Sequence, residues 1–367
     1  MLRVVVDAIA SPDAGGASSA TVQMMGYLES YPNVELIAEP KVNSRIVRTW
    51  DRLLSSSIFT ELAPLVLRKN THYEIKVKST NASLVFFLNP TNNARFLNCT
   101  NFYTTIWDLG HRELGWLTDF KQHQWNRIKE QQLRNDLYRA KLIFVESEDT
   151  ADKVSKIYGI SRDRIIKIPF IPRKEFMDNK LPKMESSNGY AIYPANFWEH
   201  KNHSTLIMAM KLLLDSGKKP LRLVFTGKDS GYEEKIRQLV SKYNLEKLVD
   251  FKNFVSLDEL IDLYLGARLT VFPSYLGPTN IPPLESIVLG TPAFVSPQAM
   301  SAKEVKDMCG ISYVPPDEIQ SWARVIDDNF LPKPFEARRN IEVLRGINIQ
   351  NEQKIQSLLR NENRDLL

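Results

Sequence analysis

The chain has 367 residues. A single hydrophobic core usually organises fewer residues than this, so we expect two domains of ordinary size. Its 43% hydrophobic and 25% charged content is typical of a soluble globular protein, and the net charge of +5 is too evenly spread to indicate a nucleic-acid-binding protein. No apolar run approaches the roughly 18 to 20 residues that span a bilayer, and the first residues lack the pattern of a signal peptide. We therefore expect a cytoplasmic protein.

Short segments rich in β-branched and aromatic residues, such as 2–10 and 101–109, alternate with stretches of helical periodicity, such as 119–141. Strands that alternate with helices imply a parallel sheet covered on both faces. We predict a first doubly wound domain over residues 1–172. The following stretch, 173–189, is polar, rich in Pro, Lys and Ser and without an apolar period, which predicts an interdomain linker.

A second and more regular alternation predicts another doubly wound domain over residues 190–340, with strands such as 190–195 and 221–227. Residues 341–367 are expected to form a helical segment, with packing back on the first domain as one option. Two such domains leave a cleft between the carboxyl ends of their strands, which is the expected position of a ligand.

Several motifs of common enzyme classes do not occur in this sequence. There is no HExxH, GxSxG, GxxxxGK[ST] or GxGxxG pattern, so zinc protease, serine hydrolase, P-loop nucleotide hydrolase and dinucleotide oxidoreductase all lose their usual support. With two cysteines and five histidines in no ligand pattern, we expect neither a disulfide framework nor a metal site.

Three turns at predicted strand ends suit an anion. Gly15 and Gly16 precede a helix whose free N–H groups point at the turn, which favours a phosphate or a sugar oxygen as much as a plain strand-to-helix connection. Lys201 follows one strand of the second domain, and Gly227 and Lys228 follow the next. Each lysine alone reads as a solvated surface charge, whereas the pair at neighbouring strand ends favours anion binding.

The stretch "FPSYLGPTNIPPLESIVLGTP" carries one carboxylate, Glu285, behind Pro282 and Pro283. Prolines suit the first turn of a helix and the helix dipole favours an acid there, so a helix start explains part of the pattern. The preceding "GPTN" turn is more elaborate than a helix start requires. It favours a second interpretation, in which the carboxylate accepts hydrogen bonds from a pair of sugar hydroxyls.

The segments "YPANFWEHKNHSTLIMAMK", "LVFTGKDSGYEEKIRQLVSKYNLEKLVDFKNFVSLDELIDLYLGARLTVFPS" and "GPTNIPPLESIVLGTPAFVS" resemble the donor-binding half of retaining glycosyltransferases of family 4, which have the GT-B fold. In the first half of the chain, "TTIWDLGHREL" and "AKLIFVESEDTADKVSKIYGISRDRIIKIPF" resemble the acceptor-side half of the same family. The resemblance implies an α/β protein with two Rossmann-like domains that face each other across a cleft.

The resemblance also implies roles for individual residues. Glu285 matches the second of two family glutamates and would bind the ribose hydroxyls, whereas the first glutamate falls on Gly277, which has no side chain. The family's basic pair on the diphosphate falls on Asn196 and Lys201, so one positive charge is missing. The turn between the two glutamate positions would offer its backbone N–H groups to the donor; it comprises Thr279, Asn280 and Ile281.

On the acceptor side, the resemblance points to the segment "IWDLGHREL". Trp107 stands where the family often has a histidine, and His111 matches a further histidine of some family members. His111 is the candidate for a catalytic imidazole that faces the cleft, and an exposed loop histidine is the alternative interpretation.

The resemblance implies a glycosyltransferase of the hexosyltransferase type that moves a sugar, with retention, from a nucleoside-diphosphate sugar to a saccharide or lipid-linked acceptor. The expected setting is polysaccharide or O-antigen-type biosynthesis. No cofactor beyond this co-substrate and no metal are expected, and a lipid-linked acceptor would bring peripheral contact with the inner face of the membrane. A nucleotide-sugar epimerase of GT-B fold and a non-catalytic nucleotide-sugar-binding subunit are the alternatives; Gly277, Asn196 and Trp107 motivate the second.

Overall fold

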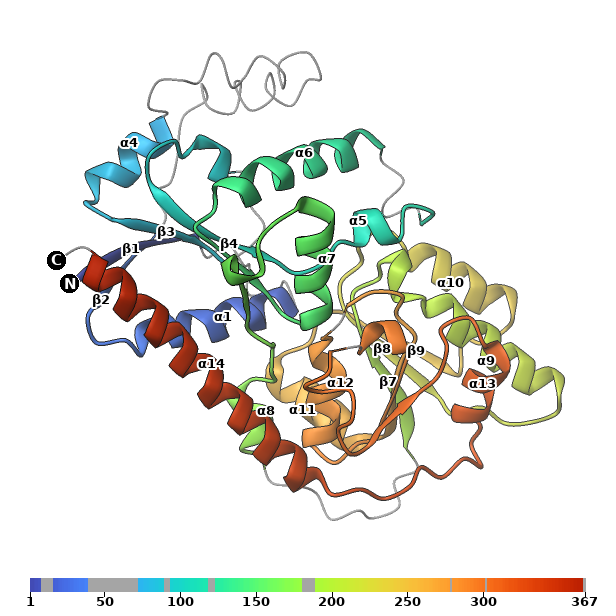
Figure 1. Ribbon diagram of the computed structural model, residues 1–367. Helices are drawn as coiled ribbons and strands as arrows, with labels where there is room; N and C mark the ends of the chain where they lie inside the picture. The colour runs from blue at the N-terminus through green and yellow to red at the C-terminus, as the bar shows by residue number, and fades with distance from the viewer. Residues whose placement is uncertain are drawn as a thin grey trace.

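The computed structural model describes residues 1–7, 16–38, 72–88, 93–117, 123–179, 189–277, 279–300 and 302–365. Within these ranges, two parallel six-stranded sheets form the two halves of the molecule (Figure 1). The order in the first sheet is β2-β1-β3-β4-β5-β6, and in the second it is β12-β11-β10-β7-β8-β9. This arrangement confirms the predicted α/β class with doubly wound sheets.

The strands of the first sheet are β1 (Leu2–Asp7), β2 (Val34–Ala38), β3 (Leu84–Phe87), β4 (Asn101–Ile106), β5 (Leu142–Val145) and β6 (Ile165–Lys167). Those of the second are β7 (Tyr190–Pro194), β8 (Leu223–Thr226), β9 (Val249–Lys252), β10 (Ala267–Phe272), β11 (Ala293–Val295) and β12 (Ile311–Tyr313).

The helices of the first half are α1 (Gly16–Glu29), α4 (His72–Ser79), α5 (Gly110–Glu113), α6 (His123–Arg139), α7 (Glu148–Tyr158) and α8 (Lys174–Met177). Those of the second are α9 (His203–Asp215), α10 (Glu233–Lys242), α11 (Leu257–Gly266), α12 (Ile281–Val288), α13 (Ile319–Val325) and α14 (Ala337–Asp365). Short 3-10 turns include η4 (Glu199–Lys201).

The first sheet is buried on both faces because its strands carry apolar residues at successive positions. Val5 packs in one core together with side chains of α4, α6 and α7, whereas Val4 and Val6 pack on the opposite face against α1 and α14. Successive side chains of a strand point to opposite faces, so a continuous apolar run serves both layers. Figure 1 shows these helices above and below the sheet.

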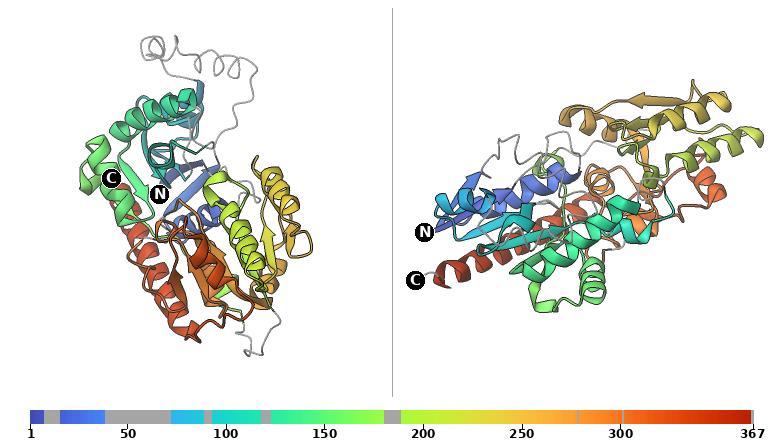
Figure 2. Two further views of the ribbon diagram at one scale, coloured as in Figure 1. Left: turned by 90° about the vertical axis from the view of Figure 1, so that its right-hand side faces the viewer. Right: turned by 90° about the horizontal axis from the view of Figure 1, so that it is seen from above.

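The long C-terminal helix α14 returns to the first half of the molecule. Tyr27 donates a hydrogen bond to Asn348 at 2.7 Å, and Tyr103 donates one to Glu362 at 2.6 Å. Ile355 and Leu359 are buried in the same core as β1 and α1. The helix is continuous from Ala337 and shows no break at residue 340, so one rod joins the two halves along one side (Figure 2).

The predicted linker is only partly described, because residues 180–188 lie outside the described ranges. Its first residues form α8, which packs against α12 of the second half. The two halves also touch next to the cleft, where the rings of Trp116 and Tyr275 meet edge to face at 5.3 Å between centroids.

Candidate functional site

A cavity of about 520 Å³ lies between the two sheets and takes its walls from both halves of the chain. Residues that follow β4, β5 and β6 line one wall, and residues that follow β7, β8, β9 and β10 line the other. The cavity therefore occupies the position expected of a ligand site in facing doubly wound domains. A second hollow of about 590 Å³, beside β12 and α13, is lined by the second half alone.

Most of the predicted donor-binding residues line this interdomain cavity. They are Asn196, Lys201, Gly227, Thr279, Asn280, Ile281 and Glu285. Gly15 lies outside the described residues, and Gly16 is the first residue of α1, whose Ser19 and Ala20 reach the cavity.

Lys228 lies elsewhere than predicted. Its side chain is not among those that line the cavity, and its ammonium lies 5.6 Å from the centre of the Phe254 ring. The backbone N–H of Lys228 donates to the side-chain oxygen of Asn196 at 2.9 Å, so this residue supports the cavity wall through its main chain.

Lys201, at the end of η4, points towards the turn that precedes α12. Its ammonium donates to Asn280 Oδ1 at 3.0 Å and lies 5.2 Å from the centre of the Phe272 ring. The Asn280 amide oxygen and the Phe272 ring orient the Lys201 ammonium at the cavity wall, where a positive charge suits an anion.

The turn before α12 depends on Gly277 and Asn280 together. Asn280 Nδ2 lies within hydrogen-bonding distance of three carbonyl oxygens, those of Leu276, Gly277 and Ala299, at 3.2, 2.9 and 2.7 Å. Gly277 has φ 113°, and a Cβ atom there would lie 2.5 Å from Asn280 Nδ2. Any side chain at this position would strain the backbone and displace Asn280.

Glu285 is buried in the cavity wall on α12. The Tyr264 hydroxyl lies 3.0 Å from Glu285 Oε2 and 3.0 Å from the Pro282 carbonyl oxygen. Burial raises the pKa of Glu285 to about 7, although the Tyr264 hydrogen bond and the charge of Arg173 act in the opposite direction. A carboxyl group can accept hydrogen bonds from the two hydroxyls of a ribose. The helix begins one residue before Pro282, as the sequence predicted.

Sequence reasoning missed three charged residues that line the opposite wall: Asp108, Glu146 and Arg173. Asp108 follows β4 and Glu146 follows β5, and these strands are paired neighbours. The signal was present, since the carboxyl ends of adjacent parallel strands meet at one edge of the sheet. Arg173 follows β6, and its Nε donates to Ser19 Oγ at 3.1 Å.

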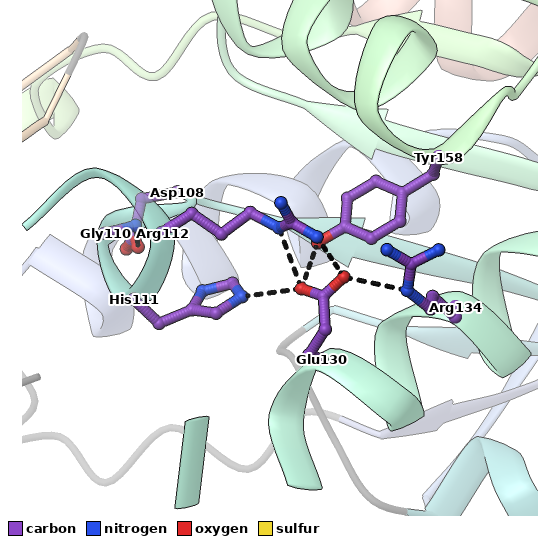
Figure 3. Close-up of polar contacts among 7 residues, drawn as sticks. All are labelled: Asp108, Gly110, His111, Arg112, Glu130, Arg134 and Tyr158. Atoms are coloured by element: carbon purple, nitrogen blue, oxygen red, sulfur yellow. Dashed lines mark hydrogen bonds and ion pairs between the residues drawn. The ribbon is translucent and has the colours of Figure 1, made fainter. Parts of the chain in front are cut away.

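His111 does not line the cavity, contrary to the prediction of an imidazole that faces the cleft. Its Nε2 lies 3.2 Å from Glu130 Oε2 on α6, and only 6% of the residue is exposed, so it is not an exposed loop histidine either (Figure 3). Burial and the charge of Lys129 lower the pKa of His111 despite the nearby Glu130 carboxylate. The Glu130 carboxylate on α6 holds the imidazole ring of His111, which does not line the cavity.

Glu130 is the centre of a polar cluster that joins α5, α6 and α7. Besides His111, Arg112, Arg134 and Tyr158 donate hydrogen bonds to its carboxylate (Figure 3). Burial opposes its ionisation, but the bonds from Arg112, His111 and Tyr158 outweigh that effect and lower the pKa of Glu130 to about 2. The cluster fixes α5, which begins two residues after Asp108, and thereby positions this part of the cavity wall.

The described residues hold no group of three or more His, Cys, Asp or Glu side chains that could bind a metal ion. Within the same residues, no helix has both the length and the apolar character needed to cross a membrane.

Comparison with known protein families finds a match in the second half of the chain. Residues 174–342 match the family model described as "Glycosyl transferases group 1". The match takes in η4, α12 and the second-half wall of the cavity.

The curated proteins that this chain resembles include bacterial mannosyltransferases. It is 28% identical over 195 residues to the O-antigen chain mannosyltransferase RfbU of Salmonella typhimurium, covering 53% of this chain and 52% of the relative. It is 26% identical over 199 residues to the O-antigen chain mannosyltransferase B of Escherichia coli, covering 52% of each. The chain thus spans about half the length of these relatives.

Solved structures show the same fold over the whole chain. Anabaena Alr3699/HepE, in complex with UDP and glucose, has a TM-score of 0.61 at 14% identity and covers 99% of each chain. Sucrose-phosphate synthase from Thermosynechococcus elongatus has a TM-score of 0.64 at 16% identity, covering 100% of this chain and 99% of that one. The fold is GT-B, as the sequence predicted.

Proposed function

We propose that the protein is a glycosyltransferase that moves a sugar from a nucleoside-diphosphate sugar to a saccharide or lipid-linked saccharide in O-antigen-type or other polysaccharide biosynthesis. The observation that carries this proposal is the interdomain cavity, in which Lys201 and Glu285 lie on one wall of a glycosyl transferases group 1 domain. The named O-antigen mannosyltransferases among the relatives support the same reaction class. We assign the chain to family 4, as a variant with "GPTN" at the turn.

In the proposed complex, the donor lies along the second-half wall. Glu285 accepts hydrogen bonds from the ribose hydroxyls, and Lys201 neutralises charge on the diphosphate. The backbone N–H groups of Asn280 and Ile281 are offered to the same phosphates, since Pro282 and Pro283 have none. Gly227, with φ 157°, lets the main chain after β8 pack closely on Ala195 after β7, since a Cβ atom there would collide with the Ala195 carbonyl.

The reaction that we propose retains the configuration at the anomeric carbon. The bond from that carbon to the diphosphate oxygen breaks, and the acceptor hydroxyl forms a new bond on the same face. Its proton passes to the leaving diphosphate, whose negative charge Lys201 stabilises. The expectation of metal-independent transfer belongs to this proposal and is tested by activity in the presence of EDTA.

The proposal is tested by a thermal-shift screen with GDP-mannose, UDP-glucose, dTDP-glucose and ADP-glucose, followed by assays for release of free nucleoside diphosphate with candidate acceptors. We expect at least one donor to raise the melting temperature and to be consumed when an acceptor is present. Binding without release would favour a non-catalytic subunit, and a new epimer without acceptor would favour an epimerase. No response to any donor contradicts the proposal.

A lipid-linked acceptor would place the protein at the cytoplasmic face of a membrane, and we propose peripheral attachment for that reason. Sedimentation with vesicles of anionic lipid tests this part. Recovery of the protein in the supernatant at low ionic strength would contradict it.

A further inference from the structure

The cavity has a polar corner, between the first-half wall and the turn before α12, whose side chains the proposed ribose and diphosphate contacts leave unused. Asp108 and Glu146 supply two carboxyl groups there, one from each of two neighbouring strand ends. Glu146 is only 4% exposed. A carboxyl group is rarely buried without hydrogen-bond partners.

Two further groups of this corner have unsatisfied hydrogen-bonding capacity. Thr279 Oγ1 and Trp107 Nε1 are both buried, both belong to residues that line the cavity, and neither has a hydrogen-bond partner among the described residues. Buried polar atoms in native proteins are nearly always paired, so two unpaired groups on one cavity indicate partners that a ligand brings.

Glu146 is close to the groups that would hold the donor diphosphate. The Thr279 backbone N–H donates a hydrogen bond to its carboxylate, and Lys201 and Asp108 both act on it electrostatically. Burial and the charge of Asp108 raise the pKa of Glu146 against the effect of that N–H and of Lys201. A ligand group that reaches this corner must therefore lie next to the diphosphate, which in a nucleotide sugar is the position of the transferred sugar.

The chemistry of the corner matches hydroxyl groups. A hydroxyl both donates and accepts, a carboxyl group accepts in either protonation state, the indole N–H only donates, and the threonine hydroxyl does both. An acidic sugar would bring its carboxylate beside Asp108, and repulsion between like charges in a cavity opposes that placement.

We propose that Glu146, with Asp108, Trp107 and Thr279, binds the hydroxyls of an uncharged transferred sugar and selects against an acidic one. This inference rests on the proposed glycosyltransferase function and adds the side chains that recognise the sugar. Gly277 has no side chain and therefore offers no carboxylate to the transferred sugar. The carboxyl groups beside the sugar, those of Asp108 and Glu146, come from the first half of the chain.

The test compares nucleoside diphosphates with nucleotide sugars by titration calorimetry. Wild-type protein and Glu146→Gln are titrated with GDP, GDP-mannose, UDP, UDP-glucose and UDP-glucuronate. Glu148→Gln is the matched control, because that carboxylate lies two residues away, on the surface, and pairs with Arg162. Thr279→Val, which removes only the unpaired hydroxyl, is a second variant.

We expect wild-type protein to bind one neutral nucleotide sugar at least tenfold more tightly than the matching nucleoside diphosphate. Glu146→Gln should lose about tenfold for the sugar nucleotide and less than twofold for the nucleoside diphosphate, and Thr279→Val should show the same split to a smaller extent. If the neutral donor is UDP-glucose, UDP-glucuronate should bind worse than UDP.

If Glu146→Gln lost the same affinity for the nucleoside diphosphate and the nucleotide sugar and had a lower melting temperature, Glu146 would only hold the two cavity walls together and would not bind the sugar. Unchanged affinities, or preferred binding of UDP-glucuronate, would also overturn the inference while leaving the proposed function intact. Failure of wild-type protein to bind any of the nucleotides would remove the proposed function and this inference together.

Discussion

The two walls of the cavity differ in the chemistry that they offer. The second-half wall presents Lys201, a turn with backbone N–H groups and a helix N-terminus, which together suit a diphosphate. The first-half wall presents Asp108, Glu146 and the indole of Trp107, which suit hydroxyl groups. The difference indicates a ligand that is anionic on one side and hydroxyl-rich on the other, as a nucleotide sugar is.

The largest expected effect concerns the second-half wall. Glu285→Ala should weaken nucleoside-diphosphate binding by roughly 100-fold, since two hydrogen bonds worth about 1.5 kcal/mol each would be lost. Calorimetry with the diphosphate identified by the screen measures this. The Tyr264 hydroxyl keeps the Pro282 carbonyl as a partner, so the fold should persist. Unchanged affinity would show that Glu285 serves only the packing of α12.

Lys201→Ala should weaken diphosphate binding by about 1.5 to 3 kcal/mol, because a charge-assisted contact is removed. Lys228→Ala is the matched control, since its ammonium lies against Phe254 and outside the cavity lining. Binding curves at two salt concentrations report the lost charge. If the two substitutions weakened diphosphate binding equally, the proposed contact between Lys201 and the diphosphate would be contradicted.

Glu285 also predicts a pH dependence of stability. Its pKa is raised from 4.5 to about 7 on folding, so its stabilising contribution is full below about pH 4.5 and is lost as the pH rises through 7. The free energy of unfolding of the wild type, relative to Glu285→Gln, should fall between pH 5 and pH 8 by on the order of 1 to 3 kcal/mol. Urea denaturation at both pH values measures the difference, and a constant difference would contradict the buried placement.

The smallest effect is expected at the turn. Gly277→Ala should lower the free energy of unfolding by about 1 to 2 kcal/mol, because φ is positive and the new Cβ meets Asn280. Gly231→Ala is the control, with φ 94° but open space around the Cβ. If both substitutions cost the same, the contact with Asn280 contributes nothing.

The second-half wall could be predicted from the sequence because its groups lie on short contiguous stretches. Pro282, Pro283 and Glu285 belong to one helix start, and Lys201 follows one strand, so local rules place them. Lys228 shows the limit of this reasoning, because its side chain packs on Phe254 although its main chain supports the wall.

The first-half wall could not be predicted in the same way. Asp108 and Glu146 are 38 positions apart in the sequence and meet only because β4 pairs with β5. The resemblance to family 4 points to His111 as a residue of the cleft, but its ring contacts Glu130 of a different helix. Side-chain direction there depends on tertiary partners, which one sequence does not reveal.

Amide hydrogen exchange with and without the nucleotide sugar identified by the screen tests the central claim, that one ligand contacts both walls. Slower exchange is predicted in the segments 279–289 and 254–260 of the second half and in 107–113 and 146–150 of the first half. The nucleoside diphosphate alone should protect the second-half segments and leave the first-half segments unchanged. Protection confined to the hollow at 313–330, or equal protection of both walls by the diphosphate alone, would contradict the account.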